Sequence, residues 1–72
     1  MEKETFELRN NEEFVPLNKI LKIKQVAQTG GHAKVLIEDE AVSVNGEIET
    51  RIRRKMRKGD LISVEGIEIE IV

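Results

Sequence analysis

The spacing of apolar residues in the first third of the chain predicts a short strand followed by a helix. Phe6 and Leu8 alternate with polar residues, which is typical of a strand, and we assign residues 4–9 to it. Helical spacing begins after Pro16, whose fixed backbone angle suits the start of a helix. The apolar positions of this predicted helix, residues 17–24, are Leu17, Ile20 and Leu21.

A second helix is predicted from Thr29-Gly30-Gly31 to about Asp39. The hydroxyl of Thr29 is suited to accept a hydrogen bond from an amide of the first turn, so Thr29 is the expected N-cap. The buried positions of this helix would be Ala33, Leu36 and Ile37. Because one of them is the small alanine, the two helices are expected to approach each other closely.

Alternation with a period of two returns after the second helix and predicts three to five short strands. Val42 and Val44 alternate with serine, and Asn45-Gly46 is a strong hairpin signal because both residues tolerate positive φ. We expect the same apolar phase to continue through Ile48 and Ile52. A turn at residues 58–60 leads to a C-terminal hairpin, residues 61–72, whose apolar positions are Ile62, Val64, Ile67, Ile69 and Ile71, with Glu68 and Glu70 outward. The order strand, helix, helix and strands predicts one α+β domain over residues 1–72.

Composition limits the classes of protein to consider. The chain has 72 residues, no Cys and two aromatic residues, Phe6 and Phe14. A domain of this size buries roughly 60% of its unfolded surface, and without disulfides or thiolate metal sites it depends on aliphatic packing. No apolar run approaches the ~18 residues of a membrane span, and the acidic start lacks the pattern of a secretory signal. We expect a cytoplasmic monomer that does not associate with membranes.

The scarcity of aromatic residues narrows the possible binding modes. We expect both Phe6 and Phe14 to be needed in the core. Folds that bind single strands by stacking bases need several exposed rings. That class of protein is therefore excluded.

Positive charge is concentrated in one segment of a chain that is acidic as a whole. Six of the 12 Lys and Arg residues lie within residues 51–58, whereas the formal net charge of the chain is −2. Polyanions respond to local potential rather than to net charge, so an acidic average does not exclude a nucleic-acid site. The basic side chains of such a run repel one another, which costs free energy unless a negatively charged partner or neighbouring acidic residues offset the repulsion.

Four motifs occur in order along residues 16–65. They are Leu17-Asn-Lys-Ile-Leu21, Thr29-Gly-Gly-His-Ala33-Lys-Val-Leu-Ile37, Val42-Ser-Val-Asn-Gly46 and Met56-Arg-Lys-Gly-Asp60-Leu-Ile-Ser-Val64. Their order and separations resemble the S-four-type RNA-binding domain, named for small-subunit ribosomal protein four. The Thr-Gly-Gly version of the second motif, the short chain, the additional N-terminal strand and the Arg-rich segment resemble its small stand-alone members, the YaaA-like and YbcJ-like proteins.

The resemblance implies a fold and a function. The fold is the alpha-L motif, in which two antiparallel helices pack against a small, mostly antiparallel twisted sheet. The function is non-catalytic binding of structured RNA, ribosomal in kind, across the helix pair and the adjoining hairpin. The general family has Ser-Arg where this chain has Thr29-Gly30, which removes one implied phosphate contact. Lys34 and the run from Arg51 to Lys58 are its expected replacements.

The start of the second helix is one candidate part of an RNA site. The first amides of a helix have no intrahelical partner and carry partial positive charge, and Gly30 and Gly31 would let an RNA backbone come close. Lys34 lies one turn after Gly30, on the same helix face. The alternative is that Thr29 only caps the helix and the glycines serve a tight turn.

The basic run is the other candidate part. In a strand, Arg51, Arg53 and Lys55 would share one face, while Arg54 would turn toward the core together with two apolar neighbours. Because a buried arginine is unfavourable, we expect a bulge or irregular loop near Arg53 and Arg54 that fans the basic side chains toward one surface. The alternative is a solvated edge that prevents aggregation, in which Arg51 pairs with Glu47 or Glu49.

The sequence contains no group of residues with the spacing of a catalytic or metal-binding motif. His32 is the only histidine, no nucleophile motif accompanies it, and a helix-surface position is expected. Residues 38–40 are acidic but lack the spacing of a calcium loop. We therefore expect neither a cofactor, nor a metal, nor catalytic residues.

The sequence thus predicts a small RNA-binding protein that recognises ribosomal RNA or a ribosome-assembly particle. Its expected site residues are Thr29, Gly30, Gly31, Lys34, Arg51, Arg53, Arg54 and Lys55. The alternative is a protein-interaction or regulatory domain, whose terminal strands or acidic face dock on a ribosome-associated or other partner.

Overall fold

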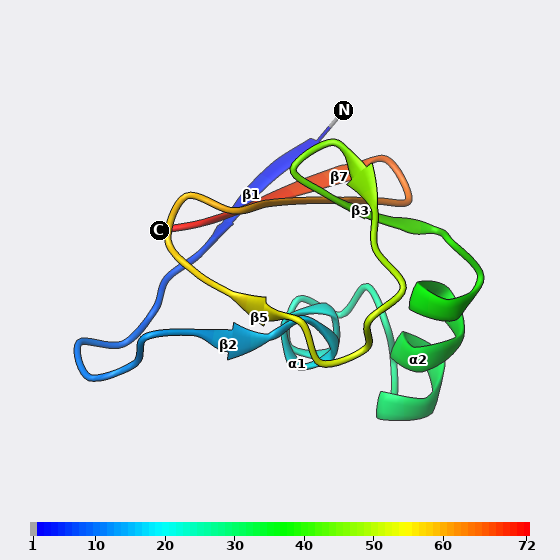
Figure 1. Ribbon diagram of the computed structural model, residues 1–72, viewed down its shortest axis with the longest axis horizontal. Helices are drawn as coiled ribbons and strands as arrows, with labels where there is room; N and C mark the ends of the chain where they lie inside the picture. Colours follow the sequence, from blue (N-terminus) through cyan, green and yellow to red (C-terminus); the bar gives the residue numbers. More distant parts are fainter. Residues whose placement is uncertain (1) are drawn as a thin grey trace.

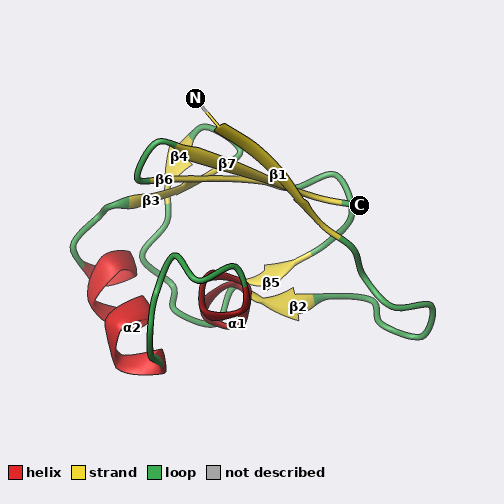
Figure 2. Ribbon diagram, turned by 180° about the vertical axis from the view of Figure 1, so that it is seen from behind, coloured by secondary structure: helices red, strands yellow, loops and turns green. Residues whose placement is uncertain are grey.

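Two layers make up the protein in a computed structural model that describes residues 2–72. A five-stranded sheet forms one layer, and two helices with a two-stranded ribbon form the other (Figures 1 and 2). The elements in chain order are β1 (Glu2–Phe6), β2 (Val15–Pro16), α1 (Leu17–Ile23), α2 (Gly30–Glu38), β3 (Val42–Val44), β4 (Glu47–Ile48), β5 (Lys55–Met56), β6 (Leu61–Val64) and β7 (Ile67–Ile71). The predicted α+β class is confirmed.

The strand order in the large sheet is β1-β7-β6-β3-β4, and every pairing is antiparallel except that of β1 with β7. The sheet turns one face toward the helices, and alternation along its strands places the branched aliphatic residues on that face. The buried residues of the sheet are Val42, Val44, Ile62, Val64, Ile69 and Ile71. Those of the other layer include Val15, Leu17, Ile20, Leu21, Ala33, Ile37 and Met56.

The N-terminal strand begins and ends earlier than predicted. The expected strand covered residues 4–9, whereas β1 is Glu2–Phe6, because it runs parallel to β7 and pairs with it from Ile67 to Ile71. Phe6 packs against the core and Leu8 is buried, which agrees with their alternation with polar residues. Leu8 lies beyond the strand, where its N–H donates to the Val72 carbonyl at 3.0 Å.

Both helices form close to their predicted bounds. α1 ends at Ile23, one residue before the expected end. α2 begins after Thr29, whose hydroxyl accepts a hydrogen bond from the His32 amide at 3.0 Å, so the predicted N-cap is confirmed. Ala33 on α2 is fully buried, and the two helices pack against each other. Among residues 2–72, no helix is long and apolar enough to cross a membrane.

The Asn45-Gly46 turn is confirmed, whereas the apolar phase expected after it is wrong for Ile48 and confirmed for Ile52, which packs against the core. Both residues have positive φ, 53° and 86°, as a two-residue hairpin turn requires. Such a turn pairs even-numbered residues with odd-numbered ones, so β4 places Ile48 opposite Ser43 on the outer face of the sheet. Ile48 is accordingly 60% exposed.

The same strand pairing places Glu49, the residue after Ile48, on the inner side of the hairpin. Its N–H donates to the carbonyl of Val42, a buried residue, at 2.9 Å. Only 5% of its surface is exposed. A carboxylate therefore occupies a place beside the core that the sequence pattern had assigned to isoleucine.

Candidate nucleic-acid interface

The basic run begins in an irregular loop between β4 and β5, as predicted near Arg53 and Arg54. Helix α1 positions this loop, because two of its first amides donate to loop carbonyls: Leu17 N–H to Arg54 at 2.8 Å and Asn18 N–H to Ile52 at 3.2 Å. The side chain of Ile52 packs against the core. Amides that would otherwise lack a partner at the helix start thus fix the loop backbone.

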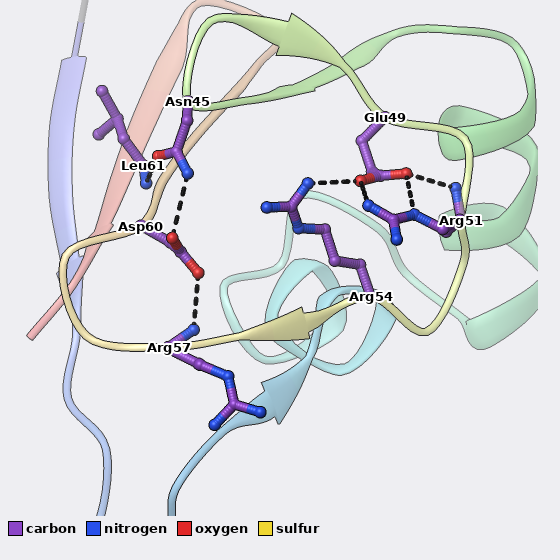
Figure 3. A network of polar contacts seen from close by, with 7 residues as sticks. All are labelled: Asn45, Glu49, Arg51, Arg54, Arg57, Asp60 and Leu61. Carbon is purple, nitrogen blue, oxygen red and sulfur yellow. Dashed lines mark hydrogen bonds and ion pairs between the residues drawn. The ribbon is translucent and has the colours of Figure 1, made fainter.

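Glu49 binds two arginines of the run (Figure 3). Its Oε2 accepts hydrogen bonds from the Arg51 backbone N–H at 2.8 Å and from Arg51 Nε at 3.0 Å. Its Oε1 accepts from Arg51 Nη2 at 2.9 Å and from Arg54 Nη1 at 2.7 Å. Both carboxylate oxygens are therefore saturated by donors from the basic run itself.

The charges in this cluster stabilise one another unequally. The hydrogen bonds from Arg51, followed by the single hydrogen bond from Arg54, lower the pKa of Glu49 from 4.5 to about 2, although burial opposes the change. The same contact raises the pKa of Arg51. The Arg51 side chain is 72% exposed and that of Arg54 is 29% exposed. Arg54 is therefore the more buried of the two arginines, whereas Arg51 makes more of the hydrogen bonds to Glu49.

The structure adds an ionic partner to the expected position of Arg54. We expected the irregular loop to fan the basic groups toward one surface, and Arg54 does line a surface hollow with the other three, but its guanidinium also binds Glu49. Arg54 points back toward Glu49, because a buried carboxylate gives a partly buried arginine an ionic partner. The alternative interpretation, that Arg51 pairs with Glu47 or Glu49, is confirmed for Glu49.

Arg53 and Lys55 differ from these two arginines. Both are exposed, and neither forms an ion pair within the described part of the chain. A shallow hollow in the surface is lined by Arg51, Arg53, Arg54 and Lys55. The structure therefore brings together four of the five basic residues predicted for the site.

A second polar network holds the end of the run (Figure 3). Asn45, in the β3–β4 turn, donates from Nδ2 to Asp60 Oδ1 at 3.0 Å and accepts from the Leu61 N–H at 2.9 Å. Asp60 Oδ2 in turn accepts from the Arg57 N–H at 2.8 Å. The Asn45-Gly46 turn therefore fixes the backbone that carries Arg57.

The first turn of α2 forms the other predicted part of the site. Thr29, Gly30, Gly31 and Lys34 are exposed, and no hydrogen bond or ion pair among residues 2–72 joins them to the basic run. Neither glycine has positive φ, and a Cβ built on Gly30 would meet nothing within 4 Å. Backbone conformation therefore does not require these glycines, which weakens the tight-turn alternative and leaves the helix start open to an approaching group.

Phe14 and Arg57 belong to this surface but were not predicted as site residues. Phe14 is half-buried and lies outside the set of residues that pack in or against the core, so the prediction of a core role for it was wrong. Lys55 Nζ lies 5.0 Å from its ring centroid and Arg57 Cζ lies 5.6 Å from it. The signal in the sequence was the alternation around buried Val15, which turns Phe14 outward.

His32 has a local structural role. It is exposed, and its Nδ1 accepts a hydrogen bond from the Gln28 N–H at 3.2 Å, next to the Thr29 cap. Within residues 2–72, no cluster of His, Cys, Asp or Glu side chains could hold a metal ion.

Sequence comparison assigns the chain to a family. The S4 domain, the S-four-type domain of the resemblance above, matches residues 6–72. This protein belongs to the S4 domain family.

Individual relatives cover most of the chain. The Bacillus subtilis (strain 168) protein named "Probable ribosome maturation protein RlbA" is 39% identical over 54 residues, which are 75% of this chain and 76% of that protein. The Escherichia coli (strain K12) protein named "Putative RNA-binding protein YbcJ" is 34% identical over 58 residues, 81% of this chain and 83% of its own.

A solved structure shares the fold. The solution structure of YbcJ from E. coli, described as having an alpha-L motif involved in RNA binding, superposes with a TM-score of 0.71 and 34% identity. The superposition covers 94% of this chain and 85% of that one. The predicted resemblance to S-four-type, YbcJ-like proteins is thus confirmed.

Proposed function

We propose that this protein binds structured RNA, without catalysis, through the basic hollow and the first turn of α2. The observation that carries the proposal is the hollow among Arg51, Arg53, Arg54 and Lys55 in a chain whose net charge is −2. Membership of the S4 domain family supports it, as do the names of RlbA and YbcJ. Lys34, with the Thr29–Gly31 turn, supplies a second phosphate contact.

Ribosomal RNA or a ribosome-assembly particle is the proposed target, and the protein acts in the cytoplasm as a monomer. The name of the B. subtilis relative supports this choice. The chemistry of the surface agrees with it, because A-form helices expose phosphates and 2′-hydroxyls more than readable base edges. Binding is then directed by the shape of the RNA rather than by its sequence.

The number of contacts sets the expected salt dependence. If four basic side chains neutralise phosphates, the logarithm of the affinity falls against the logarithm of the salt concentration with a slope of about −3. Affinity then falls roughly 50- to 100-fold between about 50 and 200 mM salt. Binding would be modest and strongly ionic.

Charge reversal on the exposed part of the run tests the proposal. Arg53→Glu removes a phosphate contact and adds a repulsion, so we expect affinity for a structured ribosomal RNA fragment to fall roughly tenfold or more. Filter binding at two salt concentrations measures it. Lys3→Glu is the matched control, because Lys3 is exposed on β1 in the other layer. Equal affinities for Arg53→Glu and Lys3→Glu would contradict the proposal.

The outer face of the sheet favours a second function, docking on a basic ribosome-associated protein. Ile48 is 60% exposed on β4, at one edge of the sheet. A hollow toward the opposite edge, at β1, is lined by Lys3, Glu4, Leu61, Glu68 and Glu70 among others. The carboxylates of this hollow suit a basic protein surface. Affinity capture before and after nuclease treatment separates the two functions: partners bound through RNA are lost, and partners docked on this face remain.

A further inference from the structure

The β2–β5 ribbon has one face in the core and one face in solvent. Val15 and Met56 are paired partners in this ribbon, and both are buried. Because side chains alternate along a strand, the residues on either side of this pair turn to the opposite face. That outward face carries Phe14, Pro16, Lys55 and Arg57.

The role of Phe14 is not explained by core packing. The other aromatic residue, Phe6, packs against the core, whereas Phe14 is absent from that contact set. Two cations lie close to the Phe14 ring: Lys55 Nζ at 5.0 Å and Arg57 Cζ at 5.6 Å from its centroid. Both distances lie within the ~6 Å range of a cation–π contact.

The backbone beneath these side chains is held in place. Arg57 donates its N–H to Asp60, which is bound in turn by Asn45, so the backbone of Arg57 is tied to the β3–β4 turn. Figure 3 shows the Arg57 side chain extending away from this network, toward β2. Lys55 is held by its pairing with Pro16 across the ribbon. The hydrogen bonds and the strand pairing therefore fix the backbone that carries Lys55 and Arg57 next to the Phe14 ring.

This arrangement matches the chemistry of one nucleotide. A base has a flat π surface that stacks on an aromatic ring, and each of its flanking phosphates carries a negative charge suited to Lys or Arg. An exposed cation–π contact is weak, so an arriving base can displace a cation from the ring while a phosphate keeps that cation nearby. Lys55 also lines the basic hollow, which makes the two surfaces continuous.

We propose that the outward face of the β2–β5 ribbon binds one unpaired nucleotide of RNA, with the base stacked on Phe14 and the flanking phosphates on Lys55 and Arg57. The proposal rests on the proposed function and specifies its substrate: an RNA stem with a single bulged nucleotide beside the part that occupies the basic hollow. One ring stacks one base, so a run of single-stranded RNA is not the expected ligand.

Two RNA hairpins test this site, one perfectly paired and one identical except for a single bulged 2-aminopurine. Stacking on one aromatic ring corresponds to roughly 5- to 150-fold in affinity. We therefore expect the wild-type protein to bind the bulged hairpin about tenfold more tightly than the paired one. The 2-aminopurine fluorescence should fall on binding, because the base stacks on Phe14.

Variants at Phe14 separate stacking from charge. Phe14→Leu keeps an apolar side chain and all the cations, so it should lose the preference for the bulged hairpin while binding the paired hairpin as the wild type does. Phe14→Trp should retain the preference and the fluorescence change. Thermal unfolding of each variant reports whether it is folded. Should Phe14→Leu not fold, the wild-type preference, its retention in Phe14→Trp and a photo-crosslink from a bulged 4-thiouridine to Phe14 still decide the matter.

The outcomes distinguish this site from the proposed function. Wild-type protein that binds both hairpins equally overturns the nucleotide site and leaves RNA binding intact. Protein that binds neither hairpin overturns both. A preference for the bulge that survives in Phe14→Leu overturns stacking on this ring.

Discussion

Two halves of the basic run carry the same charge in the sequence but have different partners in the structure. Arg51 and Arg54 share the buried carboxylate of Glu49, whereas Arg53 and Lys55 form no ion pair within the described residues. A phosphate that approaches Arg54 competes with an acceptor at 2.7 Å, and a phosphate that approaches Arg53 competes only with water. The charge density of a segment therefore overstates the charge that is free to bind a ligand.

The free energies of the contacts indicate which arginine remains bound to Glu49. A hydrogen bond to a charged group contributes about 1.5–3 kcal/mol, and its loss leaves a buried carboxylate without a donor. A solvent-exposed ion pair contributes about 0–1 kcal/mol. We therefore expect Arg54 to remain on Glu49 in the proposed RNA complex. Arg51 is more exposed and keeps unused donors, so we expect it to contribute in part.

Removal of the Glu49 charge abolishes the difference between the paired and the unpaired basic residues, and it has the largest expected effect on stability. In Glu49→Gln the donors of Arg51 and Arg54 meet a neutral amide, so we expect the free energy of unfolding to fall by about 1–3 kcal/mol. Urea denaturation measures the loss. The released arginines should also make RNA binding more steeply salt-dependent.

The matched control is Glu47→Gln on β4. Glu47 is exposed and has no ion pair among residues 2–72, so its substitution should change stability by less than about 0.5 kcal/mol. Equal losses for the two variants would show that Glu49 does not organise the loop.

Acid tests the same carboxylate without a change of shape. The pKa of Glu49 is about 2 in the folded protein and 4.5 as its ordinary value, so its stabilisation is complete above pH 4.5 and is lost as the pH falls toward 2. The difference in unfolding free energy between wild type and Glu49→Gln should shrink over that range. A difference that stays constant from pH 5 to pH 2 would contradict the lowered pKa.

Gly30→Ala should change stability and RNA affinity in opposite directions at the first turn of α2. The new methyl group meets nothing, and alanine favours helix, so stability should rise by up to about 1 kcal/mol. RNA affinity should fall, because the methyl group keeps the phosphate from the helix start. Gly46→Ala is the contrasting control, since its φ of 86° makes alanine destabilising there. Unchanged affinity in Gly30→Ala would remove the α2 start from the site.

The smallest effect is expected at Ile48, the residue that precedes Glu49 and faces the other way. Ile48→Thr should change stability by less than about 0.5 kcal/mol and leave RNA affinity unchanged, because the side chain is 60% exposed on the outer face. Ile62→Val, at a fully buried position, should lose about 1 kcal/mol in the same denaturation assay. A loss of RNA affinity in Ile48→Thr would place part of the interface on the outer face.

Local sequence signals predicted most of the fold, because their causes are local. The Thr29 cap and the Asn45-Gly46 turn depend on a few adjacent residues, and both are confirmed. The bounds of β1 could not be predicted, because they depend on where β7, at the other end of the chain, pairs with it. The family of the chain was predicted from four ordered motifs and is confirmed.

The errors near the site share one cause. We carried the alternation of Val42 and Val44 directly through the turn to Ile48, although a two-residue turn exchanges odd and even positions. Correct pairing places Glu49 inward, and an inward carboxylate explains why Arg54 also turns inward. Phe14 was missed because the alternation around Val15 indicates an outward ring only once β2 is known to pair with β5, and that pairing is not local.

Salt dependence of RNA binding tests the central claim most directly. Affinity for one structured RNA is measured from low to high salt for wild type, Arg53→Ala and Arg51→Ala. We expect Arg53→Ala to reduce the magnitude of the log–log slope by about 1 and Arg51→Ala to reduce it by clearly less. Equal reductions, a larger reduction in Arg51→Ala, or binding that is independent of salt would contradict that claim.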